Sequence, residues 1–435
     1  GSGHGIRPLG ALAVDDHRDG TPDVAGRGQH SSGGQTACCT LPLVDCVHYS
    51  PRTRPWVHAL TLGSVVWLLA RLVVLGISLV AWCTELSPGV TDRLGDPSAD
   101  SVTGLPGLLG HWDTNYYFTI ASQGYGADAE YGLAAFFPGY PYLSRWVAAV
   151  LPSQNTGLAM LVVASASSWW AAVVFSRLVA LETGSGDELS YNELLPVVLL
   201  MAGPYSVFLY ASYAESLYLA LAVTAWYLAR RGCWWTCAAL LSLAVLVRVN
   251  AVFLVAAVLV MQACRCGLSR WWRFSWVVLP AGFLLGWFAR LYSVTGDALA
   301  WSHAQGHGWN RELNLPVMTI ARTLGVAAVG STPDRQLQFL LDFIFFLVVL
   351  SCCWAWWRRR DYAELTYATL LVLSMGTSTT LVSFARNSVT LFPTWVLAGD
   401  VLTRARTRVR VLAMTSSFLL FTLNTFLFSI GAWTD

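Results

Sequence analysis

The stretch HWDTNYYFTIASQGYGADAEYGLAAFFPGYP, residues 111–141, stands apart from the rest of the chain. It opens with an aspartate among aromatic residues, His111-Trp112-Asp113, and closes with the run FFPGYP at 136–141. Nearly everything after it is apolar. This contrast predicts a polar segment just outside a bilayer, followed by apolar helices that build a cavity facing it.

The composition supports a membrane protein. Of the 435 residues, 55% are hydrophobic and only 12% are charged, whereas soluble domains have about 25% charged residues. So few charges cannot cover a water-exposed surface, which predicts an all-α, polytopic membrane protein. The net charge of +2, without a basic patch interleaved with aromatic residues, gives no indication of nucleic acid binding.

The first 50 residues differ from the remainder. They are rich in Gly, Ser, Asp and His with little apolar periodicity, which predicts a disordered N-terminal tail at 1–50 and one membrane domain at 51–435. No group of cysteine and histidine residues has the spacing of zinc ligands. We therefore expect neither a metal site nor a cofactor.

About 11 apolar segments are candidate transmembrane helices. They are 58–83, 157–181, 194–211, 213–230, 233–249, 251–265, 274–294, 337–357, 363–383, 389–403 and 411–431. Arg71 lies inside the first of them and is expected either to face a polar partner or cavity, or to snorkel to the surface. Residues 84–133 form a long polar loop after this first span.

The arginines predict the orientation, because cytoplasmic loops are enriched in basic residues. Arginine clusters occur at 52–54, 177, 230–231, 265–273, 358–360 and 404–410, and the chain contains no lysine. All of them are cytoplasmic only if the proline-containing segment 134–151 does not cross the membrane. The loop 84–133 and the polar residues near membrane depth then share the extracytoplasmic face. A polar cavity on one face favours an enzyme over a channel or transporter.

Asp113 is the first candidate for chemistry. A carboxylate that is shielded from bulk water can act as a general base toward a hydroxyl within hydrogen-bond reach. Trp112 and the pair Tyr116-Tyr117 are apolar walls that would raise its pKa or pack on a sugar ring. The alternative is a solvated aspartate in a loop.

Further candidates flank the spans. Glu215 follows a segment rich in tyrosine, which forms either a cavity wall or an interfacial aromatic belt. Arg248, near Asn250, and Arg386 have no basic neighbours, and a planar guanidinium suits a phosphate. A structural ion pair with Glu215 is the alternative for Arg248. At 303–310 two histidines lie four residues apart, as metal ligands on a helix could, but an intervening glycine argues against a helix that presents both. We expect a loop there, either a plain one or one that contacts a sugar through polar groups and stacking on Trp309.

The motifs together resemble the GPI mannosyltransferase 2 (PIG-V) family. The opening stretch is similar to its signature, of the general form (H/R)WD…Y…IA…GY…FFPG(F/Y)P. Residues 204–217 resemble P-x-S-x-F…Y-x-E-S-L, residues 248–251 resemble R-S-N-G, and Trp309-Asn310 is the W-N pair. Arg386 with Phe392-Pro393 matches part of a C-terminal R-Y…F-P motif, with Asn387 where an aromatic residue is usual.

The resemblance implies a GT-C glycosyltransferase that transfers mannose, with inversion and without a metal, from a polyprenyl or dolichyl phosphate. Asp113 would be the catalytic carboxylate. The residues expected to bind substrate are His111, Trp112, Tyr117, Glu215, Arg248, Asn250, Trp309, Asn310 and Arg386.

The lack of lysine indicates a bacterial homologue. Its partners would be polyprenyl-phosphate-mannose, a lipid or cell-envelope glycan acceptor, and the lipids of the plasma membrane, with the active site on the extracytoplasmic face. In a eukaryote the site would face the lumen of the endoplasmic reticulum. The alternatives are a transferase for another lipid-linked sugar, a secondary transporter, and a scaffold without activity.

Overall fold

The computed structural model describes residues 53–84, 105–126, 131–183, 191–432 and 434. All of them belong to one compact unit, 43–435. The predicted tail at 1–50 lies outside the described residues, as do parts of the loop predicted at 84–133.

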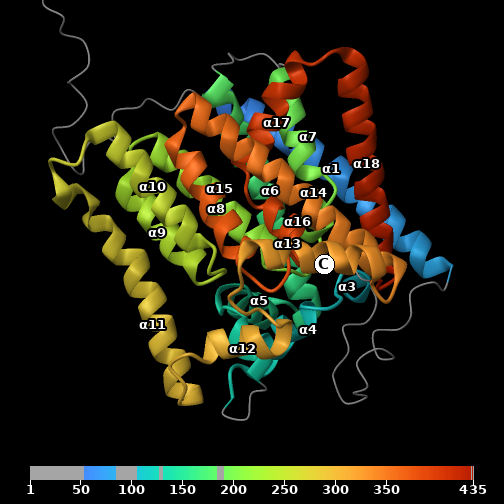
Figure 1. Ribbon diagram of the computed structural model, residues 1–435. Helices are drawn as coiled ribbons and strands as arrows, with labels where there is room; N and C mark the ends of the chain where they lie inside the picture. Colours follow the sequence, from blue (N-terminus) through green and yellow to red (C-terminus); the bar gives the residue numbers. More distant parts are fainter. Residues whose placement is uncertain (1–52, 85–104, 127–130, 184–190, 433, 435) are drawn as a thin grey trace, which may run out of the picture. The chain divides into compact units, whose positions relative to one another are not determined.

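The described residues form α-helices and short 3-10 helices (η) and contain no β-strand, which confirms the predicted all-α class (Figure 1). In chain order the elements are α1 (Thr53–Cys83), α3 (Leu105–Leu108), α4 (Thr114–Gln123), η1 (Tyr131–Ala135), α5 (Gly139–Val150), α6 (Thr156–Thr183), α7 (Tyr191–Met201), η2 (Ser206–Leu209), α8 (Glu215–Arg230), α9 (Trp234–Val245), α10 (Ala251–Cys266), η3 (Trp271–Val277), α11 (Val278–Thr295), α12 (Ala300–Trp309), α13 (Pro316–Val329), α14 (Pro333–Arg359), α15 (Tyr362–Gly376), α16 (Phe384–Val389), α17 (Pro393–Arg404) and α18 (Thr407–Ser429).

The chain is a multi-pass membrane protein, but the predicted count of 11 spans is not confirmed. Five helical segments are long and apolar enough to cross a bilayer: Trp56–Cys83, Thr156–Thr183, Trp271–Thr295, Pro333–Arg359 and Thr407–Ser429. The other predicted spans correspond to helices of at most 16 residues, which reach about 24 Å against a hydrocarbon core of about 30 Å. Hydropathy cannot separate these helices from the apolar turns that adjoin them.

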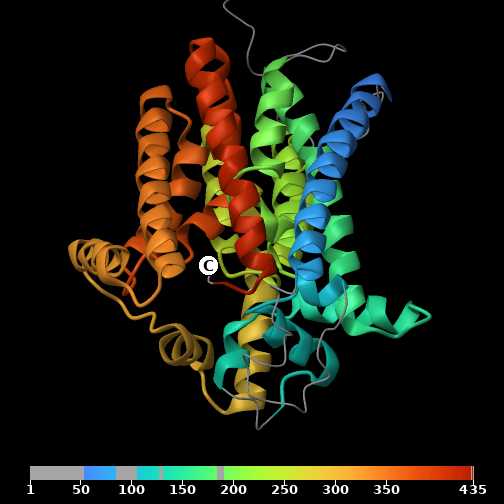
Figure 2. The same cartoon turned by 90° about the vertical axis from the view of Figure 1, so that its right-hand side faces the viewer.

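The two ends of the helical bundle differ in character. Figure 2 shows α1 (blue) and α18 (red) as upright helices, with α4, α5 and α12 gathered at the lower end of the bundle. The arginine-rich connection between α17 and α18 lies at the opposite end in both views (Figures 1 and 2). Helix α5 has 12 residues, too few for a full crossing. The described part of the polar stretch 111–141 therefore lies at one end of the bundle.

Small residues let α1 and α6 approach closely, as is common between membrane helices. A Cβ atom built on Gly63 would lie 2.7 Å from the Cα atom of Val173 in α6. Two hydrogen bonds cross the same interface: the indole N–H of Trp67 donates to Ser168 Oγ at 2.9 Å, and that of Trp169 donates to Ser64 Oγ at 2.9 Å.

The segment 202–214 between α7 and α8 is mostly irregular and almost wholly buried, so polar side chains from distant helices must satisfy its backbone. Arg71 Nη1 of α1 donates to the carbonyl oxygen of Tyr210 at 2.7 Å. Asn424 Nδ2 of α18 donates to the carbonyl oxygen of Pro204 at 2.9 Å. The mid-span arginine thus has a buried partner, and these bonds fix the chain directly before α8 begins.

The α1–α6 interface gives a first prediction. Gly63→Ala is expected to destabilise the protein by about 1–3 kcal/mol, because the added methyl group meets backbone atoms of α6. Gly76→Ala is the matched control on the same helix, since nothing lies within 4 Å of a Cβ atom there. Thermal unfolding in detergent measures both variants. Equal unfolding midpoints for the two variants would show that the packing of α1 against α6 does not require the close approach at Gly63.

Candidate active site

A cavity of about 110 Å³ lies where the polar end of the bundle meets the membrane helices. Its walls come from the start of α4, from η1, from the connection between α9 and α10, from α12 and from α16. The lining residues are Asp113, Tyr117, Ala135, Phe136, Phe137, Val247, Arg248, Val249, Asn250, Trp301, Gln305, Trp309, Arg311, Ser383, Arg386 and Asn387. Five separate parts of the chain therefore meet here.

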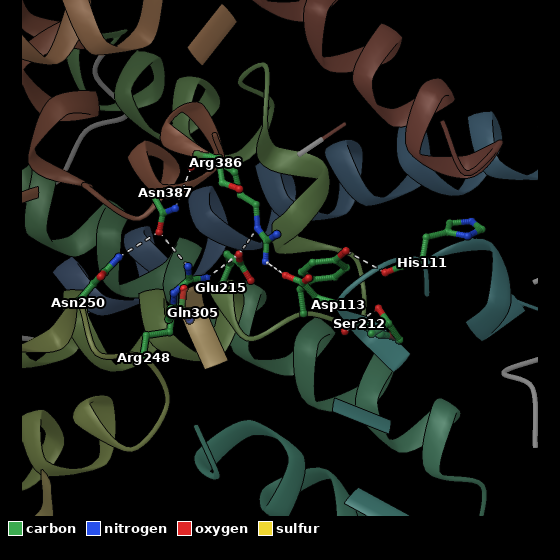
Figure 3. A network of polar contacts seen from close by, with 12 residues as sticks. His111, Asp113, Ser212, Glu215, Arg248, Asn250, Gln305, Arg386 and Asn387 are labelled. Carbon is green, nitrogen blue, oxygen red and sulfur yellow. Dashed lines mark hydrogen bonds and ion pairs between the residues drawn. The ribbon is translucent and has the colours of Figure 1, made fainter. Parts of the chain in front are cut away.

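Arg386 is the centre of this site (Figure 3). Its Nη2 atom lies 2.7 Å from Asp113 Oδ2, and its Nε atom lies 2.5 Å from Glu215 Oε1. The guanidinium also lies over the rings of Phe208 and Tyr213, with centroids at 4.8 and 4.5 Å. Two carboxylates and two aromatic faces hold this buried arginine in one orientation.

Arg248 is held in a second branch of the same network. Its Nη1 atom lies 2.5 Å from Glu215 Oε1, and its Nη2 atom donates to Asn387 Oδ1 at 2.8 Å. Asn250 Nδ2 donates to the same oxygen at 3.0 Å. Asn387 Nδ2 donates to the carbonyl oxygen of Ser383 at 2.8 Å, which fixes the amide so that its oxygen faces Arg248.

These four charged groups balance. Asp113 and Glu215 contribute two negative charges, and Arg248 and Arg386 contribute two positive charges. Glu215 is fully buried and lies between the two arginines, while the Asp113 side chain keeps 15% of its surface exposed. Asp113 is therefore the carboxylate that a substrate in the cavity can reach.

Aromatic side chains form another part of the cavity wall. Trp309 of α12 packs against Tyr116 and Phe136, with ring centroids 5.6 and 5.3 Å away. Tyr117 is buried beside Phe136, and burial raises the pKa of its phenol well above the ordinary value. The wall therefore offers apolar ring surface and a neutral hydroxyl group.

The segment 303–310 was expected to be a loop, and this expectation is wrong for most of it, because α12 spans Ala300–Trp309. Gly306 and Gly308 are tolerated inside the helix, whose Trp301, Gln305 and Trp309 follow one another at intervals of four and all line the cavity. His303 faces away and pairs with Asp297 at 2.7 Å.

The structure brings most of the predicted site residues together. Asp113, Tyr117, Arg248, Asn250, Trp309 and Arg386 line the cavity, and Glu215 supports both arginines from behind.

His111, Trp112 and Asn310 do not line it. The His111 ring points away from Asp113 and packs on Phe428 at 5.4 Å, while its carbonyl oxygen accepts a hydrogen bond from the Tyr213 hydroxyl (Figure 3). Trp112 and Asn310 adopt positive φ at the start of α4 and the end of α12.

Sequence reasoning missed several lining residues. Asn387 stands where the family motif usually has an aromatic residue, and Phe136 and Phe137 belong to the stretch 111–141 without a predicted role. Arg311 directly follows the motif at 309–310, whereas Trp301 lies eight residues before it, and neither carries a motif of its own. An i, i+4, i+8 pattern of Trp301, Gln305 and Trp309 was the signal available for α12.

The comparisons with known proteins agree with the motifs. Residues 59–269 match the family described as Mannosyltransferase (PIG-V). The resemblance predicted from the sequence is thereby confirmed for this part of the chain, which includes Asp113, Glu215, Arg248 and Asn250. Trp309 and Arg386 lie beyond it, and the geometry of the cavity connects them to it.

Two curated relatives are similar over part of their length. The chain is 34% identical to human GPI alpha-1,6-mannosyltransferase 2 over 158 residues, 34% of this chain and 30% of the relative. It is 31% identical to the enzyme of the same name from Cricetulus griseus over 172 residues, 38% of this chain and 33% of the relative. The match thus spans about a third of each relative.

Two solved structures are distantly similar. ArnT from Cupriavidus metallidurans bound to undecaprenyl phosphate has a TM-score of 0.48 and 15% identity, with 79% of this chain and 62% of that chain covered. The archaeal oligosaccharyltransferase AglB from Archaeoglobus fulgidus has a TM-score of 0.43 and 12% identity, with 85% and 55% covered.

The position of Glu215 gives a second prediction. Glu215→Gln removes the charge that lies between two buried arginines, and breaking such a pair costs about 3–5 kcal/mol. The thermal unfolding midpoint in detergent should fall by many degrees. Glu312→Gln, at an exposed position at the same end of the bundle, is the control and should leave the midpoint unchanged. An unaltered midpoint for Glu215→Gln would contradict the described ion pairs.

Proposed function

We propose that this chain, in which residues 59–269 are those of a PIG-V-type mannosyltransferase, is a GT-C membrane enzyme. It transfers mannose from polyprenyl-phosphate-mannose to a hydroxyl group of a lipid-linked or cell-envelope glycan. One observation carries the proposal: a reachable carboxylate, Asp113, shares a cavity with two arginines that come from distant parts of the chain. A base and a phosphate site are the two groups that this reaction needs.

The proposed transfer is a single displacement. Asp113 accepts the proton of the acceptor hydroxyl while the oxygen attacks the anomeric carbon from the side opposite the phosphate. The bond between the anomeric carbon and the phosphate oxygen breaks, and its electron pair leaves with polyprenyl phosphate. The configuration at the anomeric carbon is inverted, and no group beyond the two substrates is consumed.

Arg386 couples the two halves of this step. In the described structure its charge is matched by Asp113 and Glu215. When Asp113 takes up the proton it loses its negative charge, and at the same moment the leaving phosphate gains one. The guanidinium then stabilises the phosphate in place of the carboxylate. The net charge of the site and its substrates therefore stays the same through the transition state.

Arg248 is the second proposed phosphate ligand. Its guanidinium lines the cavity and keeps a fixed orientation through Glu215 and Asn387. A planar guanidinium can contact two phosphate oxygens at once, which adds orientation to charge. The aromatic wall with Trp309 and Tyr117 is proposed to pack against the sugar rings.

The proposed location is the extracytoplasmic face of a bacterial plasma membrane. Helix α8 supports this, because Glu215 is its first residue and Arg230 its last, about 24 Å apart. The site therefore lies at the end of α8 opposite to the arginine cluster at 230–231. Basic residues favour the cytoplasm, so the cavity is expected to face the other compartment.

The base is tested by Asp113→Asn, which keeps the size of the side chain but cannot accept the proton. Mannose transfer from polyprenyl-phosphate-mannose in proteoliposomes is expected to fall about 10²–10⁴-fold. Asp297→Asn changes a half-buried aspartate that pairs with His303 and does not line the cavity, and this variant should keep full activity. Retained activity in Asp113→Asn would remove this residue from the role. Transfer of another sugar from its polyprenyl phosphate, but not of mannose, would favour the alternative donor.

The phosphate site is tested by Arg248→Lys, which keeps the charge but loses the planar fork. The KM for the lipid-linked donor is expected to rise about tenfold, the equivalent of ~1.4 kcal/mol. Arg322→Lys, at an exposed position of α13, is the control. A donor KM equal to that of the unmodified protein would show that Arg248 does not contact the phosphate.

A further inference from the structure

An acidic residue, Asp342, lies fully buried in the apolar helix α14. Ionisable side chains inside membrane helices are costly and are retained where they have a specific partner. Asp342 belongs to none of the motifs and does not line the cavity. The contacts of its carboxylate therefore indicate its role.

The Asp342 carboxylate reaches the backbone of α16. Its Oδ1 atom accepts a hydrogen bond from the N–H of Ala385 at 2.8 Å. Ala385 lies in the first turn of α16, where backbone N–H groups have no partner within the helix. Ser383, the residue at the N-cap position, makes no capping hydrogen bond through its side chain. An aspartate from another helix thus does what an N-cap residue ordinarily does.

This external cap matters because α16 is short. It has six residues, and a helix of that length is not stable without outside support. It also follows Ser383, whose φ of 64° places the backbone in the left-handed region, an unfavourable conformation for a residue with a side chain. The start of α16 therefore depends on contacts from elsewhere.

The residue directly after Ala385 is Arg386, which contacts Asp113 and Glu215. We propose that Asp342 is a positioning residue, which fixes the first turn of α16 and thereby sets the Arg386 guanidinium for the phosphate of the lipid-linked substrate. The inference rests on the proposed function of the cavity, and it adds a residue that touches no substrate.

The experiment compares two substitutions at this position. Asp342→Asn keeps an oxygen that accepts the Ala385 N–H and should behave like the unmodified protein. Asp342→Leu removes the acceptor, and the affinity for decaprenyl phosphate, measured by native mass spectrometry, should fall about tenfold. The kcat/KM for mannose transfer should fall about 100-fold, as expected when a reacting group is misplaced.

A double-mutant cycle separates positioning from general stability. In an Arg386→Ala background Asp342→Leu should cause no further loss of decaprenyl phosphate binding, because its effect passes through Arg386. Gln262→Leu is the matched control, since Gln262 is equally buried and hydrogen-bonded to Trp276 in another part of the bundle. It should lower the unfolding midpoint without changing binding.

Three results would overturn the inference. They are unchanged binding in Asp342→Leu, additive losses in the double variant, and a loss in Asp342→Asn as large as in Asp342→Leu. Failure of the proposed function would give a different result. The unmodified protein would then bind decaprenyl phosphate but would not transfer mannose. Since the binding measurement does not need transfer, the two outcomes can be told apart.

Discussion

The ion pairs of Arg386 are the interaction on which the rest of the site depends. One guanidinium joins Asp113, from the polar stretch at the end of the bundle, to Glu215, the first residue of a membrane helix. A buried positive charge without these partners would be costly, so α4, α8 and α16 must come together for any of them to be stable. The cavity is the space that this requirement leaves between them.

The fold class and much of the site could be predicted from the sequence, because both depend on local signals. Hydropathy indicates membrane helices. The motifs at 111–113, 215 and 248–250 contain polar residues in apolar surroundings, where such residues are costly and therefore indicate a site. The number of spans could not be predicted in this way, since α7, α9 and α17 are short helices beside apolar turns. Hydropathy averages over such turns.

Other features depend on contacts between distant residues. Asn387 differs from the aromatic residue usual in the motif, yet its amide oxygen accepts hydrogen bonds from both Arg248 and Asn250. The helical state of 300–309 could not be read from Gly306 and Gly308, because contacts with η1 outweigh their low helix propensity. His111 and Trp112 directly precede Asp113 in the sequence, but the turn before α4 directs their side chains away from the cavity.

The charge balance of the cavity bears on turnover. Both arginines already have acidic neighbours, so in the proposed function free inorganic anions would bind weakly at this site, and selectivity for a lipid carrier would come from its confinement to the membrane. In the proposed reaction the same balance favours departure of the spent carrier. Once Asp113 passes its proton to solvent, its carboxylate competes with the phosphate for Arg386 and helps to expel it. In this proposal the Asp113 carboxylate both starts the reaction, as the base, and promotes release of the product phosphate.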